Sequence, residues 1–190
     1  YGIFMMFFAA NIMQFPYKVL HGDLDFFLTK PINSQFLISI KEIGMGNLLS
    51  VSSGVALMTY SWIHLDIPLN FSRFLVAIMF TGIGITLFYS IFMIGAITSI
   101  WTKHSEFSSN LMVRLWGLVH TPGTLFQMVP SIIFTYFIPL LIVCTIPVQI
   151  FLHKVSLPML AWAIVITAIW FFACAFFWRF ATRYYTSASS

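Results

Sequence analysis

The sequence predicts an all-α fold: a polytopic transmembrane helical bundle with about four full spans, preceded by the end of a truncated first span. Its 190 residues are 60% hydrophobic and only 7% charged, and its mean hydropathy is +0.95, which is far from the composition of a soluble globular domain. A helix needs about 20 apolar residues to cross the hydrocarbon core, so the length allows four or five spans with short connections. Residues 1–190 are therefore expected to form one membrane domain.

The first apolar run, residues 1–14, is shorter than a full span. The chain starts at Tyr1 rather than at a methionine and enters this run directly. We expect residues 1–14 to be the end of a span whose beginning is missing.

The next stretch, residues 16–31, is the longest one that is difficult to place inside a membrane. The period of its apolar residues predicts an amphipathic helix. Pro16 suits a first helical turn, and Pro31 disfavours helical geometry in the residue before it. The residues expected on its apolar face are Leu20, Leu24, Phe27 and Leu28. Periodicity alone allows two interpretations: a connector lying in the headgroup layer, or a docking element whose polar face meets a soluble partner.

Four apolar segments follow and are expected to be the full spans: residues 43–62, 74–101, 126–150 and 159–180. Asn33 and Ser34 offer an N-cap for a helix that starts near Gln35 and continues as the first of these spans to Trp62. The second is longer than one crossing requires and must tilt, bend or project. Aromatic and arginine side chains at the end of the last span predict an interfacial anchor.

Two rows of small residues recur at a spacing of four along these spans. The first row is Gly46, Ser50 and Gly54, and the second is Gly82, Thr86 and Ser90. Small side chains allow helices to approach closely in lipid. The rows are consistent either with a dimer or solute-pathway face or with packing inside one chain.

The expected span over residues 126–150 contains Pro130, Pro139 and Pro147. Three prolines make a regular helix improbable, so kinks or a discontinuous helix are expected. Such a break exposes backbone carbonyls, which protein or water must cover at membrane depth. It marks either a pathway or only the shape of the helix.

The basic residues predict the orientation of the bundle. Placing residues 16–31 in the cytoplasm leaves only Arg73 and Lys154 outside, by alternation of the spans. The basic residues then inside are Lys18, Lys30, Lys41, Lys103, Arg114, Arg179 and Arg183. Seven against two obeys the positive-inside rule.

Several kinds of chemistry lack a sequence signature in this chain. It contains no GxxxxGK[ST] loop for ATP phosphates, no GxSxG elbow and no HExxH spacing. The expected spans lack the acidic and basic residues that proton-coupled carriers use. Cys144 and Cys174 lie in apolar segments without a ligand pattern. The net charge of +4 is scattered and does not suggest nucleic-acid binding. We expect no enzyme activity, no cofactor and no metal site in this chain, so that power for transport would come from a partner.

Two blocks resemble one family. The run HGDLDFFLTKPINSQF, residues 21–36, is similar to a signature that follows the second span in permease subunits of ATP-binding-cassette (ABC) transporters of the type-2 export class. The block HTPGTLFQMVPSIIFTYFIPLLIVCTIP, residues 120–147, resembles a later segment of the same family. It has His120, Thr121 and Pro122 where the family usually has Arg-Tyr-Pro. Both blocks occur in the family's order.

The resemblance implies a permease subunit that forms the solute pathway, exports solute and is powered by a separate ATPase subunit, which binds ATP and magnesium. A second permease subunit, identical or related, and a bacterial plasma membrane are also implied. Residues 16–31 would be the coupling helix on which the ATPase docks. Its docking residues would be His21, Gly22, Asp23, Leu24, Asp25, Phe27, Leu28 and Pro31. The alternative is a membrane anchor or receptor component that docks a cytosolic partner without transport.

Overall fold

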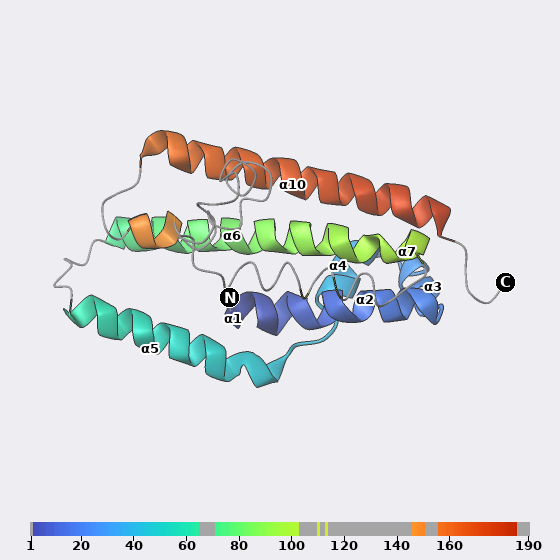
Figure 1. The fold of residues 1–190 in the computed structure, drawn as a ribbon, viewed down its shortest axis with the longest axis horizontal. Coiled ribbons are helices and arrows are strands. Elements are labelled where there is room, and N and C mark those ends of the chain that lie inside the picture. The colour runs from blue at the N-terminus through green and yellow to red at the C-terminus, as the bar shows by residue number, and fades with distance from the viewer. Residues whose placement is uncertain are drawn as a thin grey trace.

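The computed structural model describes residues 2–64, 71–102, 110, 113, 146–150 and 156–185, and throughout these ranges the regular structure is helical, with no strand. Figure 1 shows the long helices side by side, with α10 next to α6, α2 beyond α6, and α5 at the outer edge. The predicted all-α class is thereby confirmed. Three described stretches are long and apolar enough to cross a membrane: Gly2–Leu20, Phe71–Thr102 and Leu157–Tyr184.

The first helical stretch runs without interruption from Gly2 to Leu20. It consists of α1 (Gly2–Phe4), one wider π-helical turn η1 (Met5–Ala9) and α2 (Ala10–Leu20). The prediction that a new helix starts at Pro16 is wrong, because α2 continues through this proline. The proline ring is fully buried against neighbouring elements, and such packing lets a membrane helix tolerate the loss of one backbone hydrogen bond.

The amphipathic segment, defined here as residues 16–31, is not one helix. It contains the end of α2, a turn at residues 21–23, and the short helix α3 (Leu24–Leu28). The break lies at Gly22, whose φ is +79°, a value that a right-handed helix cannot contain and that glycine adopts at little cost. The N–H of His21 donates to the carbonyl of Tyr17 (3.1 Å), so the end of α2 stays hydrogen-bonded.

A predicted helix from Gln35 to Trp62 is also interrupted. Asn33 caps α4 (Ser34–Ser39) as expected, since its Oδ1 accepts from the backbone N–H of Gln35 (3.0 Å) and of Phe36 (3.3 Å). A non-helical connector, residues 40–44, then leads to a 3₁₀ turn, η2 (Met45–Asn47), and to α5 (Leu48–His64). The 17 residues of α5 extend for about 26 Å. The span expected over residues 43–62 is thus a regular helix only from Leu48 onward.

The remaining long helices agree with the expected spans and extend beyond them. Helix α6 (Phe71–Ile97) is followed by the short α7 (Ser99–Thr102), where residues 74–101 were expected. Helix α10 (Leu157–Tyr184) covers the span expected over residues 159–180. Of the span expected over 126–150 only residues 146–150 are described, and they are helical.

The main hydrophobic core joins the N-terminal helix, α3, α4, the second half of α6, α7 and α10. Its aromatic contacts include Phe4 with Phe92 (ring centroids 5.5 Å apart) and Phe15 with Trp178 (5.6 Å). Helix α5 contributes no buried residue to it. The core therefore fixes the amphipathic segment at one end of a three-helix unit and leaves α5 outside that unit.

Candidate functional site

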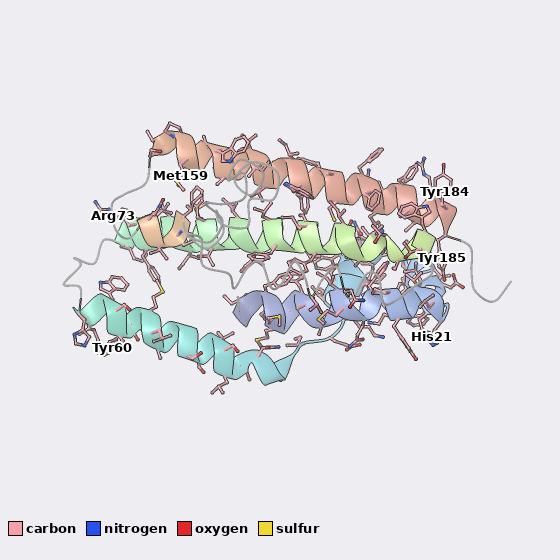
Figure 2. The ribbon with its side chains drawn as sticks, viewed as in Figure 1. His21, Tyr60, Arg73, Met159, Tyr184 and Tyr185 are labelled. Carbon is pink, nitrogen blue, oxygen red and sulfur yellow. The ribbon has the colours of Figure 1, made fainter. Side chains whose placement is uncertain are left out.

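The amphipathic segment lies at one end of the bundle. Figure 2 shows His21 at the same end as Tyr184 and Tyr185, which close α10, whereas Arg73 lies at the opposite end. The segment and the end of α10 therefore lie at the same end of the bundle. The predicted docking residues from His21 to Pro31 are close together there.

Two side chains anchor α3 to the rest of the protein. Leu24 is fully buried and Phe27 is 3% exposed. The ring of Phe27 lies between two cations, with Lys18 Nζ 6.0 Å and Lys41 Nζ 5.1 Å from its centroid. These contacts combine apolar burial with cation–π attraction. They hold Leu24 and Phe27 against the neighbouring helices.

The opposite side of the segment faces outward. His21 and Asp23 are exposed, Gly22 and Asp25 are half-buried, and Pro31 is exposed. Leu28 is 37% exposed, so the prediction that it packs on the membrane domain is wrong. The turn at Gly22 ends the period on which that prediction rested, and α3 is only five residues long.

Aromatic side chains add apolar area to this outward surface. Phe26 is 61% exposed, and Lys30 Nζ lies 4.2 Å from the centroid of its ring. Tyr17 stacks on His21 with ring centroids 3.7 Å apart. The surface thus presents carboxylates, a lysine and aromatic rings together, a composition suited to binding another protein. The sequence did not single out Tyr17 or Phe26.

A polar row on α2 holds the connector. Asn11, fully buried, donates from Nδ2 to the carbonyl of Glu42 (2.7 Å) and accepts from its N–H through Oδ1 (2.9 Å). One turn further along, Gln14 Nε2 donates to Glu42 Oε2 (2.7 Å), and Lys18 Nζ lies 3.5 Å from Glu42 Oε1. We call these four residues the Glu42 clasp. The hydrogen bond from Gln14 and the positive charge of Lys18 lower the pKa of Glu42.

The end of α10 meets the amphipathic segment through Tyr185. Burial raises the pKa of the Tyr185 hydroxyl, and the negative charges of Asp25 and Asp23 raise it further. A residue just beyond the last span is thus within electrostatic reach of both carboxylates.

Helix α4 contacts two spans through polar side chains that the sequence did not reveal. Gln35 Nε2 donates to the hydroxyl of Tyr89 on α6 (3.1 Å) and to Sγ of Cys174 on α10 (3.3 Å). Ser39 Oγ and the Tyr89 hydroxyl are 2.8 Å apart. Trp178 Nε1 donates to Ser34 Oγ (3.4 Å). Cys174 is therefore a buried free thiol, as expected, and it also accepts a hydrogen bond.

The two small-residue rows are mostly open. A Cβ atom added at Gly46, Gly54 or Gly82 would meet nothing within 4 Å, so these positions make no close helix contact within the described chain. Ser50 and Ser90 are exceptions: a Cβ on Gly2 would lie 3.1 Å from the carbonyl carbon of Ser50, and Ser90 is fully buried. In the second row, the hydroxyls of Thr86 and Ser90 bond to the backbone of their own helix.

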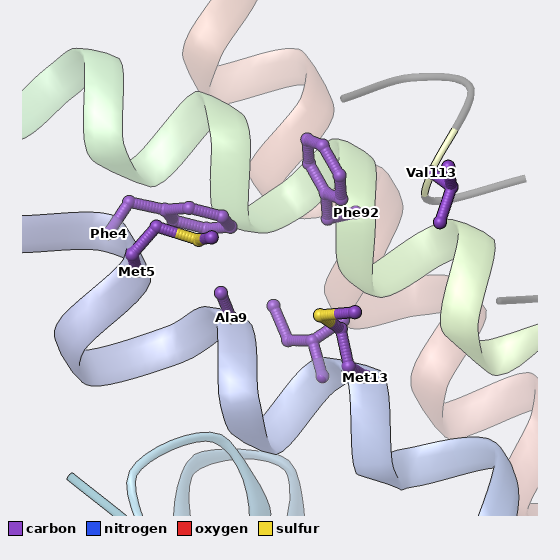
Figure 3. Close-up of a pocket in the computed structure, with 7 residues that line it drawn as sticks. Phe4, Met5, Ala9, Met13, Phe92 and Val113 are labelled. Atoms are coloured by element: carbon purple, nitrogen blue, oxygen red, sulfur yellow. The ribbon is translucent and has the colours of Figure 1, made fainter. Parts of the chain in front are cut away.

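A small apolar pocket of about 80 Å³ lies between the N-terminal helix and α6. Figure 3 shows Met5 and Met13 on one side and Phe92 on the other. The remaining lining residues are Phe4, Ala9, Ile12 and Val113. No polar surface lines it, so it suits an apolar group and nothing that needs a hydrogen bond.

Pro147 lies in the helical stretch 146–150 and is half-buried, whereas Pro130 and Pro139 lie outside the described residues. The expected kinks there are therefore not described. Among the residues that the structure does describe, no three His, Cys, Asp or Glu side chains are close enough to hold a metal ion.

Apolar helices of spanning length and a surface suited to protein binding define the chain as a membrane subunit of a larger assembly. The family profile described as ABC-2 family transporter protein matches residues 1–189. The chain belongs to this family, and it is a permease component of an ABC transporter. No curated protein and no solved structure matches it.

Proposed function

We propose that this chain is the permease subunit of an ABC exporter, that it forms the solute pathway, and that a separate ATPase subunit docks on the outward surface of the amphipathic segment. ATP and magnesium would be bound by that ATPase. A second permease subunit, identical or related, would complete the pathway in a bacterial plasma membrane, with the amphipathic segment on the cytoplasmic side. Family membership supports the permease role.

The docking proposal rests on one observation: one side of the amphipathic segment is buried in the core, and the other side is exposed. Leu24 and Phe27 anchor it in the core, whereas Asp23 and Phe26 are exposed at the end of the bundle. An anchored element with a charged and aromatic outer surface transmits force from a partner to the core. A connector resting in lipid headgroups has no need of such an anchored carboxylate surface.

Charge reversal tests the docking surface. We expect Asp23→Lys combined with Asp25→Lys to leave the protein folded in the membrane but to weaken co-purification of the ATPase by about tenfold or more, since like charges at a contact oppose binding. Asp66→Lys, in the turn expected on the other side of the membrane, is the matched control. The measurement is ATPase recovered per permease after detergent extraction.

Transport is measured in the same preparation. Inside-out vesicles should take up an exported solute only when ATP is added outside, and the double reversal should abolish this uptake. Undiminished ATPase binding by the double variant would contradict the docking proposal. Binding without any ATP-driven uptake would instead favour a membrane anchor that docks a cytosolic partner.

A further inference from the structure

Helix α4 begins shortly after the amphipathic segment ends, and it is in contact with α3. The cap from Asn33 fixes the first turn of α4, with Oδ1 accepting from two backbone N–H groups. Only Pro31 and Ile32 separate this cap from Lys30. We therefore expect a displacement of α3 by a partner to displace α4.

The other side of α4 is attached to α6 and α10. The side-chain amide of Gln35 spans both helices, because it reaches Tyr89 (3.1 Å) and Cys174 (3.3 Å) at once. Ser39 adds a second contact to the Tyr89 hydroxyl (2.8 Å). Ser39 is 2% exposed, so water cannot readily replace these bonds. Breaking one leaves a polar atom unpaired in an apolar surrounding, and the network therefore moves as a unit.

Helix α5 approaches α1 at Val51 and α6 at Trp62, whose ring centroid is 6.3 Å from that of Phe74, and it is the next long helix after α4 in sequence. The connector, residues 40–44, and the turn η2 separate α4 from α5. The connector is held by the Glu42 clasp on α2 and by the N–H of Gly44, which donates to the carbonyl of Met6 (2.7 Å). The chain between α4 and α5 is thus attached to α2 and, through Lys41 and the ring of Phe27, to α3.

We propose that Gln35 and Tyr89 are positioning residues that transmit displacement of the amphipathic segment to α6 and α10. This inference rests on the proposed function, since the displacement comes from the docked ATPase. It adds which spans move together and which side chains join them.

The test follows the distance between α5 and α10 in the complex with the ATPase. Spin labels are placed at Leu57 and Phe172, whose side chains are 67% and 69% exposed. They are attached through introduced keto amino acids, so that Cys174 remains unmodified. The distance distribution is recorded in lipid nanodiscs without nucleotide and with ATP, magnesium and vanadate.

Tyr89→Phe removes one hydroxyl and keeps the ring. We expect it to retain ATPase binding and ATP hydrolysis but to lose about half or more of the nucleotide-driven change in distance, because the shared partner of Gln35 and Ser39 is gone. Tyr60→Phe, on the exposed surface of α5, is the matched control and should show the full change. Ser39→Ala is a second variant that breaks the same network, should Tyr89→Phe fold poorly.

The outcomes separate the two proposals. If the unmodified permease does not bind the ATPase, or shows no distance change with nucleotide, the proposed function is wrong and this inference falls with it. If binding and the distance change occur but both Tyr89→Phe and Ser39→Ala retain the full change, only the transmission through Gln35 and Tyr89 is wrong.

Discussion

Helices α5 and α6 are both strongly apolar, yet one is outside the core and the other is at its centre. None of the 17 residues of α5 is buried, whereas α6 buries most of its second half, with Leu87, Met93 and Ile97 at 1% exposure or less. Hydropathy alone therefore does not choose the neighbours of a helix. Side-chain shape does so, because van der Waals packing replaces the hydrophobic drive between helices in lipid.

Helix α5 approaches α1, where a Cβ on Gly2 would lie 2.9 Å from Val51 Cγ2, and α6, where the ring centroids of Trp62 and Phe74 are 6.3 Å apart. Helices α5 and α6 should therefore differ in how much stability they lose when the same substitution is made in each.

The largest difference should come from matched leucine truncations. Leu87→Ala, at 1% exposure, should lower the free energy of unfolding by about 2–5 kcal/mol through loss of contacts and creation of a cavity. Leu57→Ala, at 67% exposure on α5, should change it by about 0.5 kcal/mol or less. Unfolding in mixed micelles of rising SDS content measures both. A comparable loss for Leu57→Ala would show that α5 is packed in the assembled transporter.

A smaller loss is expected at the Glu42 clasp. Asn11→Ala removes both hydrogen bonds to the Glu42 backbone and leaves those groups unpaired, which should cost about 1–3 kcal/mol. Asn47→Ala is the control, because its Nδ2 contacts are at 3.4 and 3.5 Å, the limit of hydrogen bonding. The same unfolding assay applies. Equal losses for the two variants would mean that Asn11 does not hold the connector.

The charge of Glu42 adds a pH dependence. Its pKa is lower in the folded protein than its ordinary value of 4.5, so its stabilising contribution is present above that value and is lost as the pH falls through the folded pKa. Stability should therefore decline on acidification below about pH 5, and Glu42→Gln should flatten this decline. A Glu42→Gln profile with the same slope as the unmodified protein would contradict a lowered pKa of Glu42 and its stabilisation by Gln14 and Lys18.

The smallest effect on a single chain is expected at Gly54. Gly54→Leu points into open space and should leave the stability of the isolated chain unchanged. If α5 forms the contact with a second permease subunit, the same change should reduce the dimer fraction measured by mass photometry. Loss of stability in the isolated chain would instead show that the row of Gly46, Ser50 and Gly54 packs within one molecule.

Composition and hydropathy were sufficient for the fold class and for the positions of the two long helices α6 and α10. Local chemistry was also sufficient at Asn33, because an N-cap depends only on neighbouring backbone groups. The break at Gly22 was missed, because the spacing of apolar residues does not reveal which residue adopts a positive φ. The interruption at residues 40–44 was missed because its hydrogen-bond partner, Asn11, lies 31 residues away.

In the candidate site, too, local features were predicted and long-range contacts were not. Charge and periodicity, which are local properties, correctly placed Leu24 and Phe27 on a buried face and Asp23 on an exposed one, although within a helix rather than a turn. The residues that tie this turn to the spans were not found. Asn11 and Gln14 in an otherwise apolar stretch, and Gln35 at the start of α4, were the available signals, since buried amides require partners.

The π-helical turn at Met5–Ala9 determines the direction in which the side chains before it point around the helix axis. Each residue of an α-helix turns the chain by about 100°, and a π turn contains one residue more than an α turn. Removing one residue here would swing Phe4 away from Phe88 and Phe92 while Phe15 stayed against Trp178. A relative with one residue fewer at this point must therefore rebuild the contact between its first helix and α6, and an alignment gap there would mark a change in packing.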